Sequence, residues 1–170
     1  MVRDSRLPEE PTPKPLSAAA ASDGSQPSIA VQAARGVDAA SLVSAEEASS
    51  ALGEAVKPAQ PFALPYGAAV QMQGCHYAVA SGGDAAVSVV SASGAIVKVL
   101  DRLYERPGAE SMDVAGGRAY LHHDTVAVVC GDAVVLIRVH RGRADVTPAL
   151  KQLASRASQR LSGSSVTAPS

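Results

Sequence analysis

Short glycine turns separate most of the β-strand candidates in this chain, and this spacing constrains the fold more than any other feature. Val70–Ala80 and Ala85–Ser91 have strand-like composition and are joined by "SGGD", whose paired glycines suit a tight hairpin. A "GD" turn joins Thr125–Cys130 to Ala133–His140. A further strand runs from Met112–Val114 through "AGGRAYLHH". Because strands joined by short turns pair antiparallel, we expect one antiparallel sheet of about five strands.

The last of these strands shows how the sheet divides its two faces. One face carries only Val135, Ile137 and Val139. The opposite face begins with apolar residues and ends in Arg138 and His140. Such alternation is typical of an antiparallel strand that rests one face on the core. We therefore expect the face of Arg138 and His140 to be half exposed.

Three segments have the end signals or the periodicity of helices. The first begins with the S-x-x-E capping box of Ser44 and Glu47 and stops at Gly53, which suits a left-handed end. The second is Gly94–Arg106, where apolar residues recur at helical spacing. The third begins at the cap residue Thr147 and carries an apolar stripe. The stripe consists of Leu150, Leu153, Ala154, Ala157 and Leu161.

These elements predict an α+β fold in which the antiparallel sheet packs against three helices. Val56–Gly67 contains three prolines and is predicted to be an irregular connection. Hydrophobic residues make up 46% of the chain, but they are mainly Ala and Val, with one Phe and no Trp. Small branched side chains favour a closely packed core and argue against a deep aromatic ligand cage.

The composition also predicts the domain boundaries. Residues 1–36 are rich in Pro, Ser, Ala and charge and lack periodicity, so we interpret them as a disordered linker. Residues 37–162 form a single α/β domain in this interpretation, and residues 163–170 form a disordered tail. The linker contains no apolar run of signal-peptide length and no cysteine to lipidate, and no segment resembles a transmembrane span. We expect a soluble chain without an export signal of its own.

The charge balance excludes some classes of partner. A formal charge of -1 provides no global field to attract nucleic acid or an anionic membrane. Basic residues do gather in the C-terminal third, but no aromatic residues lie between them to stack on bases. We interpret them as solvated residues and predict no nucleic-acid partner. They are Arg138, Arg141, Arg143, Lys151, Arg156 and Arg160.

Two residue clusters suggest chemistry, and neither predicts a catalytic site. His122, His123 and Asp124 follow one another at a strand end, so at most two of them could share a metal, and we interpret them as a polar turn. Cys75 and His76 are adjacent on a strand and point to opposite faces, which argues against a nucleophile and its base. The sequence therefore predicts no enzyme activity, no metal and no cofactor.

The order of the motifs resembles that of an actinobacterial lipoprotein family of unknown function. "DAASLVSAEEASSALGEAV" is similar to the capped helix that opens this family, and Cys75-His76-Tyr77 stands where the family has a Cys-x-aromatic strand. "VAGGRAYLHHDTVAVVCGDAVVLIRV" and "DVTPALKQLASRASQRL" are similar to its later strands and final amphipathic helix. The resemblance covers about residues 37–162 and includes the related LpqN-like lipoproteins.

The resemblance implies a PsbP-like α/β/α sandwich and a place outside the cytoplasm, in the cell envelope or secreted. The chain departs from the family in having no lipobox and in carrying Ala39-Ala40 where the first family cysteine stands. A bridge from that position cannot form here. We therefore expect a Cys75–Cys130 disulfide if the chain is exported, provided that the two strands lie side by side.

By this resemblance, the expected function is that of a non-catalytic binding domain for a protein, peptide or envelope component. Tyrosine and arginine are favoured in contact sites, so we select these residues as the candidate binding face. The candidates are Tyr66, Tyr77, Tyr104, Tyr120, Arg138 and His140.

Two alternatives belong to other classes. One is a small metal-dependent hydrolase that uses His122, His123 and Asp124, with His76 as a further candidate; it requires these side chains to converge in one pocket. The other is a cytosolic protein-interaction domain, which the absent export signal favours.

Overall fold

The computed structural model describes residues that all belong to one compact unit, residues 31–170. The described residues are 37–66, 70–94, 97–98 and 107–164. The predicted linker over residues 1–36 lies outside them, as do residues 165–170 of the predicted tail.

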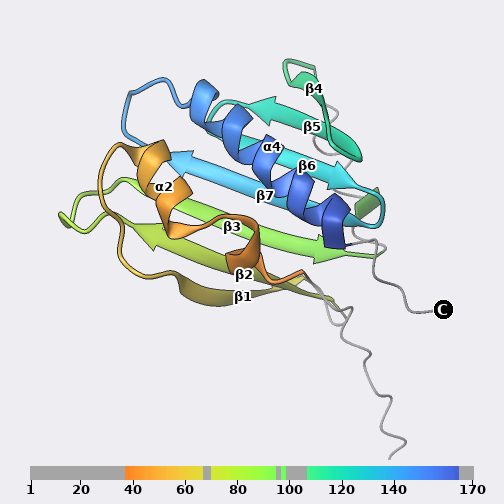
Figure 1. Ribbon diagram of the computed structural model, residues 1–170, viewed down its shortest axis with the longest axis horizontal. Coiled ribbons are helices and arrows are strands. Elements are labelled where there is room, and N and C mark those ends of the chain that lie inside the picture. Colours follow the sequence, from red (N-terminus) through yellow and green to blue (C-terminus); the bar gives the residue numbers. More distant parts are fainter. Residues whose placement is uncertain (1–36, 67–69, 95–96, 99–106, 165–170) are drawn as a thin grey trace, which may run out of the picture. The chain divides into compact units, whose positions relative to one another are not determined.

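A seven-stranded antiparallel sheet forms the centre of this unit (Figure 1). Its strand order is β1-β2-β3-β7-β6-β5-β4. The strands are β1 (Gln60–Tyr66), β2 (Val70–Ala78), β3 (Ala86–Ser93), β4 (Glu110–Val114), β5 (Gly117–His122), β6 (Thr125–Cys130) and β7 (Ala133–His140). The class is α+β, but the prediction of about five strands, and with it the five-stranded PsbP-like sandwich, is wrong. The bounds of β6 and β7 are as predicted.

One of the two missed strands is β1, which was predicted to be an irregular connection because of its prolines. It pairs with β2 from Gln60 opposite His76 onward and forms one edge of the sheet. Backbone N–H groups of alternate residues point to the same edge of a strand, so Pro61 and Pro65 can both face outward, where no partner strand needs a donor. Proline at an edge also blocks pairing with a further strand.

The other missed strand comes from the segment around "AGGRAYLHH", which folds as a hairpin of β4 and β5. Val114 pairs with Gly117, so Ala115 and Gly116 make a two-residue turn, in which Gly116 has a φ of 73°. Gly117 serves a different purpose: a Cβ at this position would lie 1.9 Å from the carbonyl oxygen of Val129. Glycine there lets β5 approach β6 closely.

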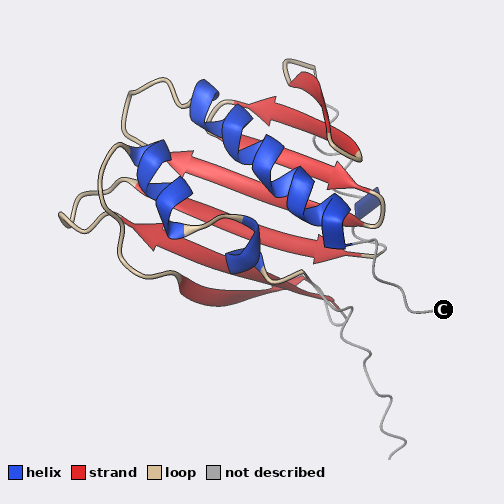
Figure 2. Cartoon of the chain, viewed as in Figure 1, coloured by secondary structure: helices blue, strands red, loops and turns tan. Residues whose placement is uncertain are grey.

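Three described helices cover one face of the sheet, which we call the helix face; the other is the second face (Figure 2). They are α1 (Ala39–Leu42), α2 (Ala45–Leu52) and α4 (Thr147–Ser164). The predicted capping box of Ser44 and Glu47 is confirmed, and so is Gly53 as the left-handed cap, with a φ of 76°. Figure 1 shows α4 lying across β6 and β7.

Both ends of α4 differ slightly from the prediction. Thr147 is the first helical residue, but the cap is made by Asp145, whose Oδ1 accepts the N–H of Thr147 at 3.0 Å. The helix continues to Ser164, so the predicted tail from residue 163 begins with two helical residues. Of the predicted helix over Gly94–Arg106, the described residues Val97 and Lys98 are helical, and residues 95–96 and 99–106 lie outside the described part.

Small side chains allow α4 to pack closely on the helix face of the sheet. Val89, Val128 and Ile137 are completely buried, as are Ala154 and Ala157 on the facing side of α4. Alanine lets a helix approach a sheet closely, and the interlocking Val and Ile side chains fill the space that remains. The predicted apolar stripe of α4 is buried throughout, which confirms its role as the core side of this helix.

Candidate binding site on the second face

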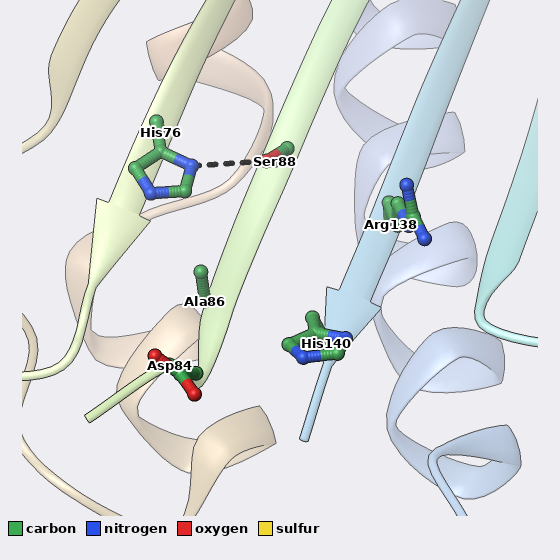
Figure 3. A pocket seen from close by; sticks show the side chains of 6 residues that line it. All are labelled: His76, Asp84, Ala86, Ser88, Arg138 and His140. Atoms are coloured by element: carbon green, nitrogen blue, oxygen red, sulfur yellow. Dashed lines mark hydrogen bonds between the residues drawn. The ribbon is translucent and has the colours of Figure 1, made fainter. Parts of the chain in front are cut away.

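Polar side chains of β2, β3 and β7 surround a hollow of about 340 Å³ on the second face (Figure 3). In each strand the lining residues occupy even positions, which point away from the helices, whereas the odd positions supply the core. The lining residues are His76, Asp84, Ala86, Ser88, Arg138 and His140.

The strand register explains why these residues meet. His76 of β2 lies opposite Ser88 of β3, and Ser88 lies opposite Arg138 of β7, so the three form one row across the sheet. Ala86 and His140 form the next row. β7 is the neighbour of β3 although the chain visits it last among the strands. The site is therefore assembled from distant parts of the sequence.

His76 and Ser88 form a hydrogen-bonded pair on one side of the hollow. The imidazole Nδ1 lies 3.0 Å from the Ser88 hydroxyl oxygen, and the tautomer of the ring decides which of the two donates (Figure 3). Both side chains are half-buried. The bond holds the ring against the sheet and gives this side of the hollow a defined hydrogen-bonding surface.

Asp124 positions Arg138 on the other side of the hollow. The Nε–H of Arg138 donates to Oδ2 of Asp124 at 2.8 Å, and the hydroxyl of Thr125 donates to Oδ1 of the same carboxylate at 3.0 Å. Burial acts to raise the pKa of Asp124, but the hydrogen bonds from Arg138 and Thr125 outweigh it and lower the pKa. Because Nε makes this bond, the two terminal amino groups of the guanidinium remain for another acceptor.

Arg138 and Asp84 lie apart along the strand direction, and the row of His140 lies between them (Figure 3). Arg138 and His140 lie on β7, whereas Asp84 lies in the loop before β3, next to Ala86 (Figure 3). The side chain of Arg138 is 63% exposed, and Asp84 and His140 are exposed as well. Val134, elsewhere on the second face, is buried and packs with Val97. The hollow is thus a polar part of this face that is open to solvent.

The predicted binding-face residues fall into three groups: two line the hollow, two are buried, and two have side chains outside the described residues. Arg138 and His140 line the hollow, in agreement with their prediction as exposed residues. Tyr77 does not belong to a surface: it is 2% exposed on the helix face, its hydroxyl donates to the carbonyl of Val43 at 2.5 Å, and burial raises its pKa. Tyr120 is also buried, at 6% exposed. The side chain of Tyr66 and the whole of Tyr104 lie outside the described residues.

His122, His123 and Asp124 form a polar turn, as predicted. His122 pairs with Thr125, which leaves His123 and Asp124 as the two-residue connection between β5 and β6. His123 has a φ of 53°, and its ring centroid lies 4.1 Å from that of His122. The carboxylate of Asp124 is directed to Arg138 instead. In the described part of the chain, no group of three His, Cys, Asp or Glu residues could hold a metal ion.

The predicted Cys75–Cys130 disulfide is wrong for this fold, because both cysteines are free and their strands are not neighbours. β3 and β7 lie between β2 and β6. Three strand spacings place the two strands about 14 Å apart, whereas the Cα atoms of a disulfide lie within about 7 Å. Burial raises the pKa of both thiols, and Cys75 is 1% exposed.

The sequence did not single out Ser88 or Asp84, and it offered His76 as a possible base for Cys75 and as a further candidate of the hydrolase alternative. One signal could have linked His76 to Ser88: the two residues are equally distant from Gly82 in the predicted hairpin, so they face each other if the turn is centred there. No local signal places Arg138 beside them, because the neighbour of β3 depends on the strand order.

Fold and site together define an α+β domain with a seven-stranded antiparallel sheet, described helices on the helix face and a solvent-open polar hollow on the second face. Comparison with family models, with curated proteins and with solved structures finds no match for the chain. Among the described residues, no helix combines the length and apolarity needed to span a bilayer.

Proposed function

We propose that this protein is a non-catalytic binding domain and that it takes its ligand in the hollow of the second face. The observation that carries this proposal is the convergence of polar side chains from β2, β3 and β7 on one solvent-open hollow. Exposed polar residues on three adjacent strands do not have to surround a concavity, so their convergence on one is informative. Convergent polar groups in a concave site are the usual mark of a ligand site.

The internal hydrogen bonds of the site support binding. The Asp124 carboxylate orients the Arg138 guanidinium, and the His76 ring is held by Ser88. Groups that are positioned before the ligand arrives lose less conformational entropy when it binds. Positioning of this kind is useful for recognition and requires no chemical step.

The hydrolase alternative loses its support, since it needs its candidate residues to converge. β3, β7 and β6 lie between β2, which carries His76, and β5, which carries His122. Four strand spacings amount to about 19 Å. Asp124 is already bonded to Arg138 and Thr125. We therefore do not propose this activity.

The place of the domain follows from the resemblance to actinobacterial lipoproteins and is part of the same proposal. We place it outside the cytoplasm, in the cell envelope or the medium, where its partner would be a protein, a peptide or an envelope component. A cytosolic interaction domain is the alternative. Fractionation of the native host with an antibody to the chain separates the two: recovery only in the cytosol would contradict the proposed place without affecting the binding site.

The binding proposal is tested by mapping amide chemical shifts in a ¹⁵N-labelled protein. Four probes of different chemistry are added in turn: triglycine, N-acetylglucosamine, inorganic phosphate and choline. We expect at least one to shift the amides of Ser88 and Arg138 and to leave those of α4 unchanged. Ala86→Leu, which fills the hollow without changing charge, should abolish these shifts. Shifts confined to other surfaces, or none with any probe, would contradict the proposal.

A further inference from the structure

The charges around the hollow indicate a class of ligand, and this inference rests on the proposed function. We propose that the hollow binds a short peptide by its two free ends, with the carboxylate at Arg138 and the ammonium group at Asp84. The proposal rests on the opposite charges of Arg138 and Asp84, which lie at the two ends of one hollow.

The arginine end suits a carboxylate. Asp124 takes the Nε–H of Arg138, so the terminal amino groups keep their planar fork for a second acceptor. Such a fork matches the two oxygens of a carboxylate, and the charged hydrogen bonds are stronger than neutral ones. His140 lies two residues further along β7 on the same face, toward Asp84, where its ring can bond to the peptide between the two ends.

The aspartate end suits an ammonium group. Asp84 is exposed and lies at the rim of the hollow, and it forms no ion pair with another described residue. A carboxylate accepts several hydrogen bonds, and an ammonium group supplies three donors. A phosphate dianion fits less well, because it brings no cation to pair with Asp84, whose carboxylate would repel it.

The distance between the two ends suits a short peptide. Ser88 lies opposite Arg138, and Asp84 precedes Ser88 by four residues. Four extended residues span at most about 14 Å, and the arginine and aspartate side chains can shorten the gap between their charged groups. A tripeptide, which spans about 10 Å, fits within this limit. Between the ends, Ser88 and His76 can bond to peptide amides.

The test uses four probes in chemical-shift titrations of the full chain. Triglycine has both charged ends, N-acetyltriglycine lacks the ammonium group, triglycinamide lacks the carboxylate, and inorganic phosphate is the competing anion. We expect triglycine to bind in the hollow with a Kd in the millimolar range and each end-blocked peptide to bind about threefold more weakly.

Two variants assign the ends. Arg138→Gln should weaken triglycine and N-acetyltriglycine about threefold and leave triglycinamide unchanged, whereas Asp84→Asn should weaken triglycine and triglycinamide and leave N-acetyltriglycine unchanged. Arg156→Gln, on the exposed side of α4, is the matched control and should change nothing.

Failure of the peptide-end proposal can be distinguished from failure of the proposed binding function. Tighter binding of phosphate, or equal binding of all three peptides at the hollow, would overturn the peptide-end proposal and leave the binding function intact. Failure of all three peptides to shift residues around the hollow would overturn the peptide-end proposal. The binding function would fall as well only if phosphate, N-acetylglucosamine and choline also failed to shift them.

Discussion

Arg160 of α4 binds the carboxylate of Glu47 of α2 with both terminal nitrogens, at 2.7 Å from Nη1 to Oε2 and 2.9 Å from Nη2 to Oε1. The same Oε2 accepts the backbone N–H of Ser44 at 2.9 Å, and Arg160 also donates to the carbonyl of Leu42. A local capping box is thereby joined to a helix 113 residues away. The ends of α1 and α2 are held to the last helix by one side chain.

Glu47→Ala should destabilise the domain more than a surface substitution does. It removes the reciprocal cap of α2 and leaves the half-buried guanidinium of Arg160 without its carboxylate. We expect a loss of about 2 kcal/mol in the free energy of unfolding, measured by urea denaturation. Glu46→Ala, at the exposed neighbour in the same turn, is the control. Equal effects of the two substitutions would show that neither the reciprocal cap nor the Arg160 pair contributes to stability.

The same pair should make stability depend on pH in the acid range. Burial acts to raise the pKa of Glu47, but hydrogen bonds from Arg160 and Ser44 outweigh it, so the folded-state pKa is lowered. The unfolded chain then takes up the proton first. The contribution is fully present above the ordinary carboxyl pKa of about 4.3 and is lost as pH falls through the folded-state value.

Urea unfolding midpoints measured from neutral pH downward test this dependence. We expect the difference in stability between the natural chain and Glu47→Gln to shrink as the pH falls below about 4. A difference that stays constant over that range would mean that protonation of Glu47 does not weaken the pair.

Gly117→Ala should be severely destabilising because the new Cβ would collide with a backbone atom, which cannot rotate away as a side chain can. The new Cβ would meet the carbonyl oxygen of Val129 at 1.9 Å, and β5 would have to move away from β6. We expect a loss of about 3 kcal/mol in thermal or urea unfolding. In Gly83→Ala, the nearest atom to the new Cβ is Cγ2 of Val79 at 3.6 Å, an ordinary contact, so this control should stay close to the natural stability.

The two thiols should be free and should differ in reactivity. Cys75 is 1% exposed and Cys130 is half-buried, and burial raises the pKa of both, which keeps the reactive thiolate scarce. Alkylation of the unreduced, folded protein should modify Cys130 first and Cys75 only on unfolding, as followed by mass spectrometry. Detection of a bridged monomer would contradict the strand order.

Local patterns in the sequence were sufficient where neighbouring residues determine the structure. The capping box of Ser44 and Glu47 and the stop at Gly53 act within one or two turns, and all three were predicted. The alternation along β7 likewise separated the core residues from Arg138 and His140 without reference to any other strand. Short turns then made these strands antiparallel, because a short connection leaves no other pairing.

Interactions between distant segments decided the strand order and the residues that meet at the site. The prolines of β1 are compatible with a strand only because β1 lies at the edge of the sheet, and no local pattern encodes an edge. The placement of β7 beside β3 brings Arg138 next to Ser88, and the same order keeps Cys75 and Cys130 apart. Strand order depends on how the whole sheet buries its apolar face. The sequence by itself therefore determined the capped helix, most of the strands and the two faces of β7. Only the tertiary structure decided that β1 is an edge strand and which polar residues share a site, because both depend on strand order.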